Sequence, residues 1–190
     1  MKYITPTLET KRLILKRGSL EDFQKVYEYD FRRLRDICGE FEFVKQDPAA
    51  IAGFETYADE DDAMDWILYL KESGASVGAP IGNLTADRIR PDLNAIELAF
   101  NVHPHHWGNG YIVEACIAAM DYLFRLGFDN IICGYSEGNK KSKRVGEKMG
   151  FELFEVKENA WMKNGVPITD YDCILSKEKF YRLNPDYQNN

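Results

Sequence analysis

Long apolar runs are missing from this sequence of 190 residues, and none approaches the roughly 18 residues that a membrane-spanning helix requires. The chain also starts without the apolar segment and small-residue cleavage site of an export signal, so we expect a cytoplasmic protein. Its four cysteines are scattered and include no Cys-x-x-Cys pair, which argues against a disulfide framework and favours reduced, buried thiols.

Positive charge is in short supply: 24 lysines and arginines face 31 aspartates and glutamates, giving a formal net charge of −7. This balance opposes binding to nucleic acids and anionic membranes, and it favours cationic partners. An apolar share of 45% in a chain of this length suffices for one full-sized core. We therefore predict a single domain over residues 1–176, followed by a polar tail over 177–190.

The hydrophobic pattern predicts an alternation of strands and helices. Strands are expected at 12–17, 80–89, 95–102, 130–135, 151–163 and 166–175, and helices at 20–34, 59–72, 111–126 and 139–149. Ser19 and Asp22 have the spacing of a capping box at the start of the first helix. The acidic run at 59–62 would start the second helix, because acids oppose the positive end of a helix dipole. The segment 36–57 has no sustained period and is expected to be irregular.

A glycine-containing loop joins the strand 95–102 to the helix that begins at Tyr111. It reads His105-His106-Trp107-Gly108-Asn109-Gly110, which places two glycines and free backbone N–H groups at a helix N-terminus, where anions bind. The phosphate loop of NTPases is excluded because Tyr111 and Ile112 replace its Lys-Ser/Thr pair. The dinucleotide fingerprint is excluded because Val113 replaces its third glycine. A different anion-binding loop and an ordinary tight turn remain as interpretations.

The helix 139–149 is basic within this acidic protein. Its only acid is Glu147, and its cationic residues are Lys140, Lys141, Lys143, Arg144 and Lys148. Such a run is either a solvated helix face or, beside an anion-binding loop, part of a site for a ligand with several phosphates. A nucleic-acid site is a third interpretation, and the net charge argues against it.

Taken together, the two segments resemble the GNAT superfamily of acyl-CoA-dependent N-acyltransferases. The loop is similar to the family signature Gln/Arg-x-x-Gly-x-Gly/Ala, with His105 in the place of Gln or Arg. The family's second pattern, Asn-x-x-Ser followed by Lys-x-Gly-Phe, is matched by Asn139, Ser142, Lys148, Gly150 and Phe151. The opening segment 8–15 and the Ile81-Gly82 strand resemble the ribosomal-protein serine/alanine N-acetyltransferase branch.

The resemblance implies an α/β fold: a mixed, mostly antiparallel, twisted sheet of six to seven strands flanked by helices, with the cofactor cleft between two splayed central strands. It implies that acetyl-CoA, the co-substrate, is held by the backbone from Trp107 to Tyr111 at its pyrophosphate and by the strand edge from Phe100 to Val102 at its pantetheine. The full set of implied cofactor-binding residues is Phe100, Val102, His105, Trp107, Gly108, Asn109, Gly110, Tyr111, Asn139, Ser142, Lys143 and Arg144. Asn139 would bond the pantetheine arm, Ser142 would lie near the thioester sulfur, and Lys143 or Arg144 would meet the ADP phosphates.

Acyl transfer to an amine needs a neutral nucleophile, so a base is useful. Glu97 is the candidate because family members often carry an acid on this strand, and His103, His105 and His106 are the alternatives. No metal is expected, because the histidines lack a further clear ligand. Many relatives place a tyrosine acid seven residues after the Asn, where this chain has Gly146. The general acid therefore stays unassigned, with Ser142, Tyr135 and water as candidates.

We expect an acetyltransferase that moves the acetyl group of acetyl-CoA to a primary amine by direct attack in a ternary complex. A protein N-terminus is the favoured acceptor, and a polyamine, an aminoglycoside or an amino acid is the alternative. The segment 36–57 and the final hairpin, including Trp161, would flank the acyl group. The competing function is a CoA-binding regulatory protein with little or no activity. A monomer and a homodimer both remain open.

Overall fold

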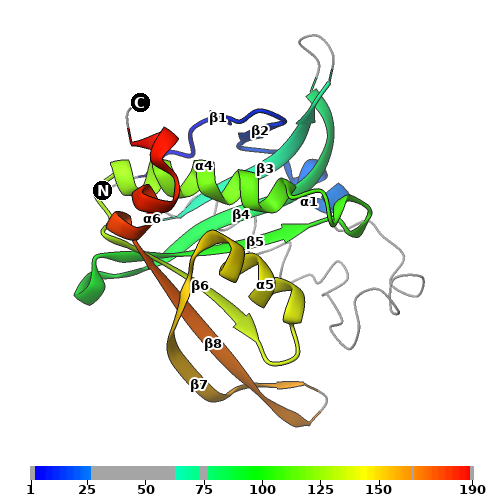
Figure 1. Ribbon diagram of the computed structural model, residues 1–190. Coiled ribbons are helices and arrows are strands. Elements are labelled where there is room, and N and C mark those ends of the chain that lie inside the picture. The colour runs from blue at the N-terminus through cyan, green and yellow to red at the C-terminus, as the bar shows by residue number, and fades with distance from the viewer. Residues whose placement is uncertain (1–2, 27–62, 73–76, 164, 189–190) are drawn as a thin grey trace. The chain divides into compact units, whose positions relative to one another are not determined.

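The computed structural model describes residues 3–26, 63–72, 77–163 and 165–188 (Figure 1). The strands are β1 (Leu8–Glu9), β2 (Leu13–Lys16), β3 (Met64–Lys71), β4 (Val77–Arg90), β5 (Ala95–Val102), β6 (Asn130–Ser136), β7 (Glu152–Lys163) and β8 (Val166–Ser176). The α-helices are α1 (Leu20–Val26), α4 (Tyr111–Arg125), α5 (Lys140–Met149) and α6 (Lys177–Leu183). Short 3-10 turns lie at Pro91–Leu93, Pro104–His106 and Pro185–Tyr187.

Eight strands form one sheet in the order β1-β2-β3-β4-β5-β6-β8-β7. β5 pairs with β6 in parallel, whereas the β1–β2, β2–β3, β3–β4, β6–β8 and β7–β8 pairs are antiparallel. This mixed, mostly antiparallel sheet with helices confirms the predicted fold class and exceeds the six to seven strands expected. In the described ranges, no helix is long and apolar enough to cross a bilayer.

The chain divides into two compact units. The first contains the described residues up to Arg88 together with Phe100–Ala119, and the second contains Ile89–Ala99 and the described residues from Met120 onward. Each expected site residue falls in one of the two. The strand edge and the glycine loop belong to the first unit, whereas Glu97 and the basic helix belong to the second.

Helix α1 starts at the predicted capping box. The hydroxyl of Ser19 accepts a hydrogen bond from the N–H of Asp22 at 3.1 Å, and the Asp22 carboxylate accepts one from the N–H of Ser19 at 3.2 Å. Phe23 and Val26 then pack on Ile67 and Tyr69 of β3. The capping box is confirmed over the described part of the helix, and the rest of the expected helix, 27–34, lies outside the described residues.

The prediction of a helix at 59–72 is wrong over its described part, because Met64–Lys71 form strand β3. The first six residues of this strand are all buried, so both of its faces are covered. Its two edges pair with β2 and β4. A strand buried on both faces loses the period-2 alternation that identifies strands in a sequence. The acidic run at 59–62 and the irregular segment 36–57 lie outside the described residues.

A close backbone approach joins β4 to the end of β5. The N–H of His103 donates to the carbonyl of Ile81 at 2.8 Å. A methyl group at Gly82 would lie 2.5 Å from the carbonyl oxygen of Asn101 and 3.2 Å from the Cα of Val102. Glycine is therefore required at position 82 for packing rather than for an unusual dihedral angle.

The second unit is arranged around β6. Ala95, Ile96 and Glu97 of β5 pair in parallel with Asn130, Ile131 and Ile132, and on its other edge β6 pairs with β8 from Asn130 to Ser136. Helix α5 packs beside β6 (Figure 1). The segment after Ser176, expected as a polar tail, forms helix α6, and its Phe180 is fully buried and packs on Phe124.

Candidate active site

The glycine loop at the start of α4 is held open by side-chain contacts. The indole N–H of Trp107 donates to the carbonyl of Val102 at 2.8 Å, and the side-chain amide of Asn109 donates to the carbonyls of His106 and Trp107 at 3.1 and 3.2 Å. Gly108 and Gly110 have φ of 80° and 76°, in the left-handed region that favours glycine. The loop therefore keeps one conformation through contacts that leave its N–H groups unused.

Several loop donors have no partner. Within the described part of the chain, the N–H groups of Gly108, Asn109, Gly110 and Tyr111 find no acceptor. A Cβ at Gly108 would meet no atom within 4 Å, so the space over the loop is open. These open N–H groups lie at the positive end of a 15-residue helix, which is the kind of position where proteins bind anions.

The strand edge at Phe100–Val102 presents its polar groups away from β4. The N–H of His103 donates toward β4, and the carbonyl of Asn101 lies against Gly82 of the same strand. Because backbone groups alternate in direction along a strand, those of Phe100 and Val102 face the opposite edge. The carbonyl of Val102 accepts from Trp107 there, so part of the predicted pantetheine-binding edge already serves the loop.

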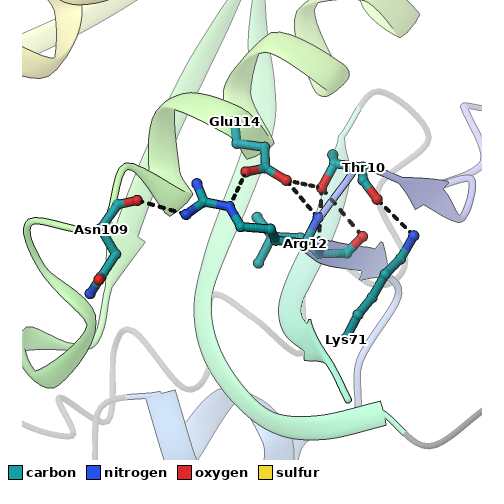
Figure 2. A network of polar contacts seen from close by, with 6 residues as sticks. Thr10, Arg12, Lys71, Asn109 and Glu114 are labelled. Atoms are coloured by element: carbon teal, nitrogen blue, oxygen red, sulfur yellow. Dashed lines mark hydrogen bonds and ion pairs between the residues drawn. The ribbon is translucent and has the colours of Figure 1, made fainter. Parts of the chain in front are cut away.

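A network that the sequence analysis missed braces the loop from the N-terminal segment (Figure 2). The Glu114 carboxylate in the first turn of α4 accepts from the Thr10 hydroxyl at 2.5 Å, from the Arg12 N–H at 2.8 Å and from Arg12 Nε at 2.6 Å. Nη1 of Arg12 donates to the carbonyl of Asn109 at 3.0 Å. Burial alone would raise the pKa of Glu114, but the hydrogen bonds from Thr10 and Arg12 outweigh it and hold the pKa below its usual value.

The basic helix α5 begins at Asn139, as predicted. The Asn139 side chain accepts from the N–H of Ser142 at 3.0 Å, so Asn139 is the N-cap of this helix. Ser142 is half-buried, Lys143 and Arg144 are exposed, and Lys143 lies 3.9 Å from Glu147 one turn later. Gly146 is buried, and it provides no phenol where many relatives carry a tyrosine.

Glu97 is half-buried on β5, and its register partner on β6 is Ile132. Its charge acts on Lys157 and on Cys133, so it lies near both side chains. Burial, together with the charges of Cys173, Glu97 and Asp172, raises the pKa of the Cys133 thiol to about 12, which keeps this thiol protonated and unreactive. Glu97 is therefore a carboxylate in a partly desolvated, mixed-charge setting.

The three histidines of the loop region lie close together. The ring of His103 lies 4.9 Å from that of His105 and 5.9 Å from that of His106, and Nδ1 of His103 accepts from the N–H of His105 at 3.3 Å. Burial, and to a lesser degree the charge of His105, lowers the pKa of His106. Among the residues described, no group of three or more His, Cys, Asp or Glu side chains could hold a metal ion.

Residues 12–152 match the family model described as an acetyltransferase (GNAT) domain. The uncharacterised N-acetyltransferase YoaA of Bacillus subtilis (strain 168) is 25% identical over 166 residues, which is 85% of this chain and 92% of YoaA. A Vibrio cholerae protein provisionally named a ribosomal-protein-serine acetyltransferase has a similar structure, with a TM-score of 0.71 and 16% identity, over 91% of this chain and 99% of that one. The microcin C7 self-immunity acetyltransferase MccE, solved with acetyl-CoA and AMP, matches with a TM-score of 0.69 and 14% identity, over 88% of this chain and 93% of MccE.

This chain belongs to the GNAT acetyltransferase family, because the family model covers most of its length. The two solved structures share its fold at low identity and carry no argument about its acceptor. The chain is thus an acetyltransferase, and its family uses acetyl-CoA.

Proposed function

We propose that this protein transfers an acetyl group from acetyl-CoA to a primary amine by direct attack in a ternary complex. The observation that carries the proposal is the row of unpartnered N–H groups from Gly108 to Tyr111 at the start of α4. Few ligands need so many aligned backbone donors, and a diphosphate is one of them. Acetyl-CoA supplies the diphosphate and an activated acetyl thioester.

The residues present fit this ligand in each unit taken separately. In the first unit, the loop N–H groups would take the pyrophosphate, and the strand edge at Phe100–Val102 would pair with pantetheine, apart from the carbonyl of Val102, which already accepts from Trp107. In the second unit, Asn139 keeps its side-chain N–H groups for the pantetheine arm while its oxygen caps α5. Lys143 and Arg144 are exposed cations that would meet the ADP phosphates.

The reaction forms a C–N bond and breaks the C–S bond. The acceptor nitrogen loses two protons: the second leaves after the C–N bond has formed and balances the proton that the CoA thiolate takes up, and the first must leave the ammonium group before attack. We assign Glu97 as the general base that accepts this proton from the ammonium group, either directly or through a water molecule. A partly buried carboxylate next to the acceptor amine can serve in this role. His106 is the strongest histidine alternative, since its lowered pKa keeps the imidazole neutral and able to accept a proton.

The leaving thiol needs no dedicated acid in this proposal. A thiol has an ordinary pKa near about 8.5, so CoA can depart as a thiolate and take a proton from water afterwards. The half-buried hydroxyl of Ser142 is the protein group best suited to hydrogen-bond the departing sulfur. The absence of a tyrosine at Gly146 is compatible with turnover for this reason.

The acceptor class is tested by incubating the protein and acetyl-CoA with a panel of primary amines and detecting products by mass. The panel contains short peptides that begin with serine or alanine, spermidine, an aminoglycoside and free amino acids.

We propose a peptide N-terminus as the best acceptor, within a reducing cytoplasm. The directly opposed cysteines 133 and 173 are buried free thiols, which fits a reduced environment.

A CoA-binding regulatory protein is the second candidate, and Gly146 is the observation that favours it. The same experiment separates the two. Release of free thiol with formation of an acetylated amine supports the enzyme. CoA binding without turnover on any member of the panel supports the regulatory protein.

A further inference from the structure

The glycine loop departs from its family signature at one place. The signature begins with Gln or Arg, and this chain has the exposed His105 there, whose N–H is turned toward His103. An imidazole is shorter than either side chain. The loop thus has a shorter side chain at this position than the signature has.

Arg12 brings a guanidinium to the same loop from the start of β2. Its Nη1 is bonded to the carbonyl of Asn109, and its carbon Cζ lies 4.5 Å from the centre of the Tyr111 ring, over the ring face. Its Nη2 lies 3.8 Å from the position that a Cβ at Gly110 would take. Arg12 therefore contacts Asn109 and Tyr111, and its Nη2 lies beside Gly110, in the segment whose N–H groups are unpartnered.

The guanidinium is fixed on one side and open on the other. Glu114, with a side chain only 19% exposed, accepts from Nε, while the Arg12 side chain is 41% exposed. Nη2 has no acceptor among the residues that the structure describes. Because Glu114 also takes the Thr10 hydroxyl and the Arg12 N–H, its carboxylate is fully engaged on the buried side. The donor face left to solvent is cationic and borders the loop (Figure 2).

We propose that Arg12 is a binding residue for the diphosphate of CoA, replacing from β2 the donor that the signature lacks at His105. The inference rests on the proposed function, because it takes the loop as the diphosphate site. The fixed position of the Arg12 guanidinium distinguishes Arg12 from Lys143. The Lys143 ammonium has one exposed partner, Glu147 on the same helix, at 3.9 Å. A guanidinium held by two bonds loses little freedom when a phosphate oxygen joins it.

The experiment compares ligands with and without the diphosphate. CoA is titrated by calorimetry and pantetheine by ligand-observed NMR, for the wild type, Arg12→Met, Arg12→Lys and a control, Arg125→Met. Arg125 is matched because it pairs with Asp121 on the same helix at 2.9 Å, with side-chain exposures of 42% and 16%. Circular dichroism checks the fold of each variant.

We expect Arg12→Met to weaken CoA binding about 10- to 30-fold, as for loss of one charge-assisted hydrogen bond, and to leave pantetheine binding unchanged. Arg12→Lys, which keeps the charge and loses the planar fork, should fall between the two proteins. Arg125→Met should bind both ligands like the wild type.

An equal loss of CoA and pantetheine affinity in Arg12→Met and Arg12→Lys would overturn the inference, because Arg12 would then only brace the loop. Unchanged CoA affinity in both variants would overturn it as well. A wild-type protein that binds no CoA would instead refute the proposed function. A selective Arg12 effect in a protein that acetylates no amine would leave the inference standing and remove the catalytic proposal.

Discussion

The ion pair between Lys157 of β7 and Asp172 of β8 should respond unequally to removal of its two partners. Nζ of Lys157 lies 2.5 Å from Oδ2 of Asp172, yet the lysine side chain is 45% exposed and the aspartate side chain only 11%. Asp172 sits opposite Gly134 on β6, where a Cβ would lie 3.0 Å from Oδ1. The carboxylate thus occupies room that the glycine provides and cannot turn to water, whereas the lysine can.

The magnitudes follow from this difference in exposure. Lys157→Met leaves a buried carboxylate without its cation, which costs about 2–3 kcal/mol. Asp172→Asn leaves a lysine that swings into solvent, and this costs about 0.5–1 kcal/mol after screening. At about 2–4 °C per kcal/mol for a chain of this size, Tm should fall by about 4–12 °C in the first variant and by about 1–4 °C in the second. The double variant should be more stable than Lys157→Met alone.

The pH dependence of this ion pair has a definite sign. The hydrogen bond to Asp172 raises the pKa of Lys157 above its usual value of 10.5; burial opposes this, and the charges of Asp172, Glu155 and Glu97 add to it. A raised folded-state pKa gives stability that is complete below the unfolded value and is lost as pH rises through the folded one. The Tm difference between wild type and Lys157→Met should therefore be full at pH 7 and shrink above pH 10.5.

Tm of the wild type, the two single variants and the double variant is measured by thermal unfolding followed by circular dichroism. The control is Lys25→Met, which removes a pair in α1 with Glu21 at 2.7 Å whose side chains are 48% and 76% exposed, and it should change Tm by less than about 2 °C. If Asp172→Asn lowers Tm as much as Lys157→Met, burial is not what makes the pair matter and the reasoning fails.

Four further substitutions have defined outcomes. Gly110→Val should raise the acetyl-CoA KM or abolish CoA binding in a folded protein, since φ of 76° disfavours valine and its methyls would lie at the loop donors; unchanged CoA affinity would refute the loop assignment. Glu97→Gln should lower kcat at neutral pH, and full activity from neutral to alkaline pH would remove it as the base. Gly82→Ala should lower the free energy of unfolding by about 1–3 kcal/mol in denaturant titrations, because its methyl meets backbone at 2.5 Å. Gly146→Ala should raise it by about 0.5–1 kcal/mol, because it lies within α5 and its methyl meets only the Cβ of Phe151, at 3.9 Å.

Local patterns account for the parts of the fold that the sequence predicts well. The capping box at Ser19 and the N-cap at Asn139 each depend on residues three positions apart. The interactions that stabilise them form within one helical turn, so the spacing of the residues in the sequence is enough to predict the local structure. The same is true of the hairpin between β7 and β8, where Gly165 has a φ of 80°.

Strand β3 was missed because its one acidic residue is not on a solvent face. Asp65 is 2% exposed, accepts from the Thr85 hydroxyl at 2.8 Å and lies 3.6 Å from Arg17. Burial, as the largest effect, raises its pKa, although Thr85 and Arg17 act against this. In the sequence, an acid among apolar residues predicts a polar stripe. Thr85 on β4 and Arg17 next to β2 give the Asp65 carboxylate the hydrogen bond and the positive charge that replace hydration. Both partners are distant in sequence, so no short-range pattern predicts them.

Arg12 and Glu114 were missed for a related reason, since the hydrogen bonds that join them span 102 positions. A sequence motif is a contiguous string of residues, so the loop signature assigns its first position to His105 and includes no residue from the N-terminal segment. A loop needs a donor at a point in space, and any strand that ends beside it can provide one. The departure at His105 is the sequence feature behind the proposal for Arg12, because an arginine or lysine beside a strand end can replace a polar side chain that a motif lacks. Arg12 meets that description, and the pantetheine comparison tests whether the compensation is real.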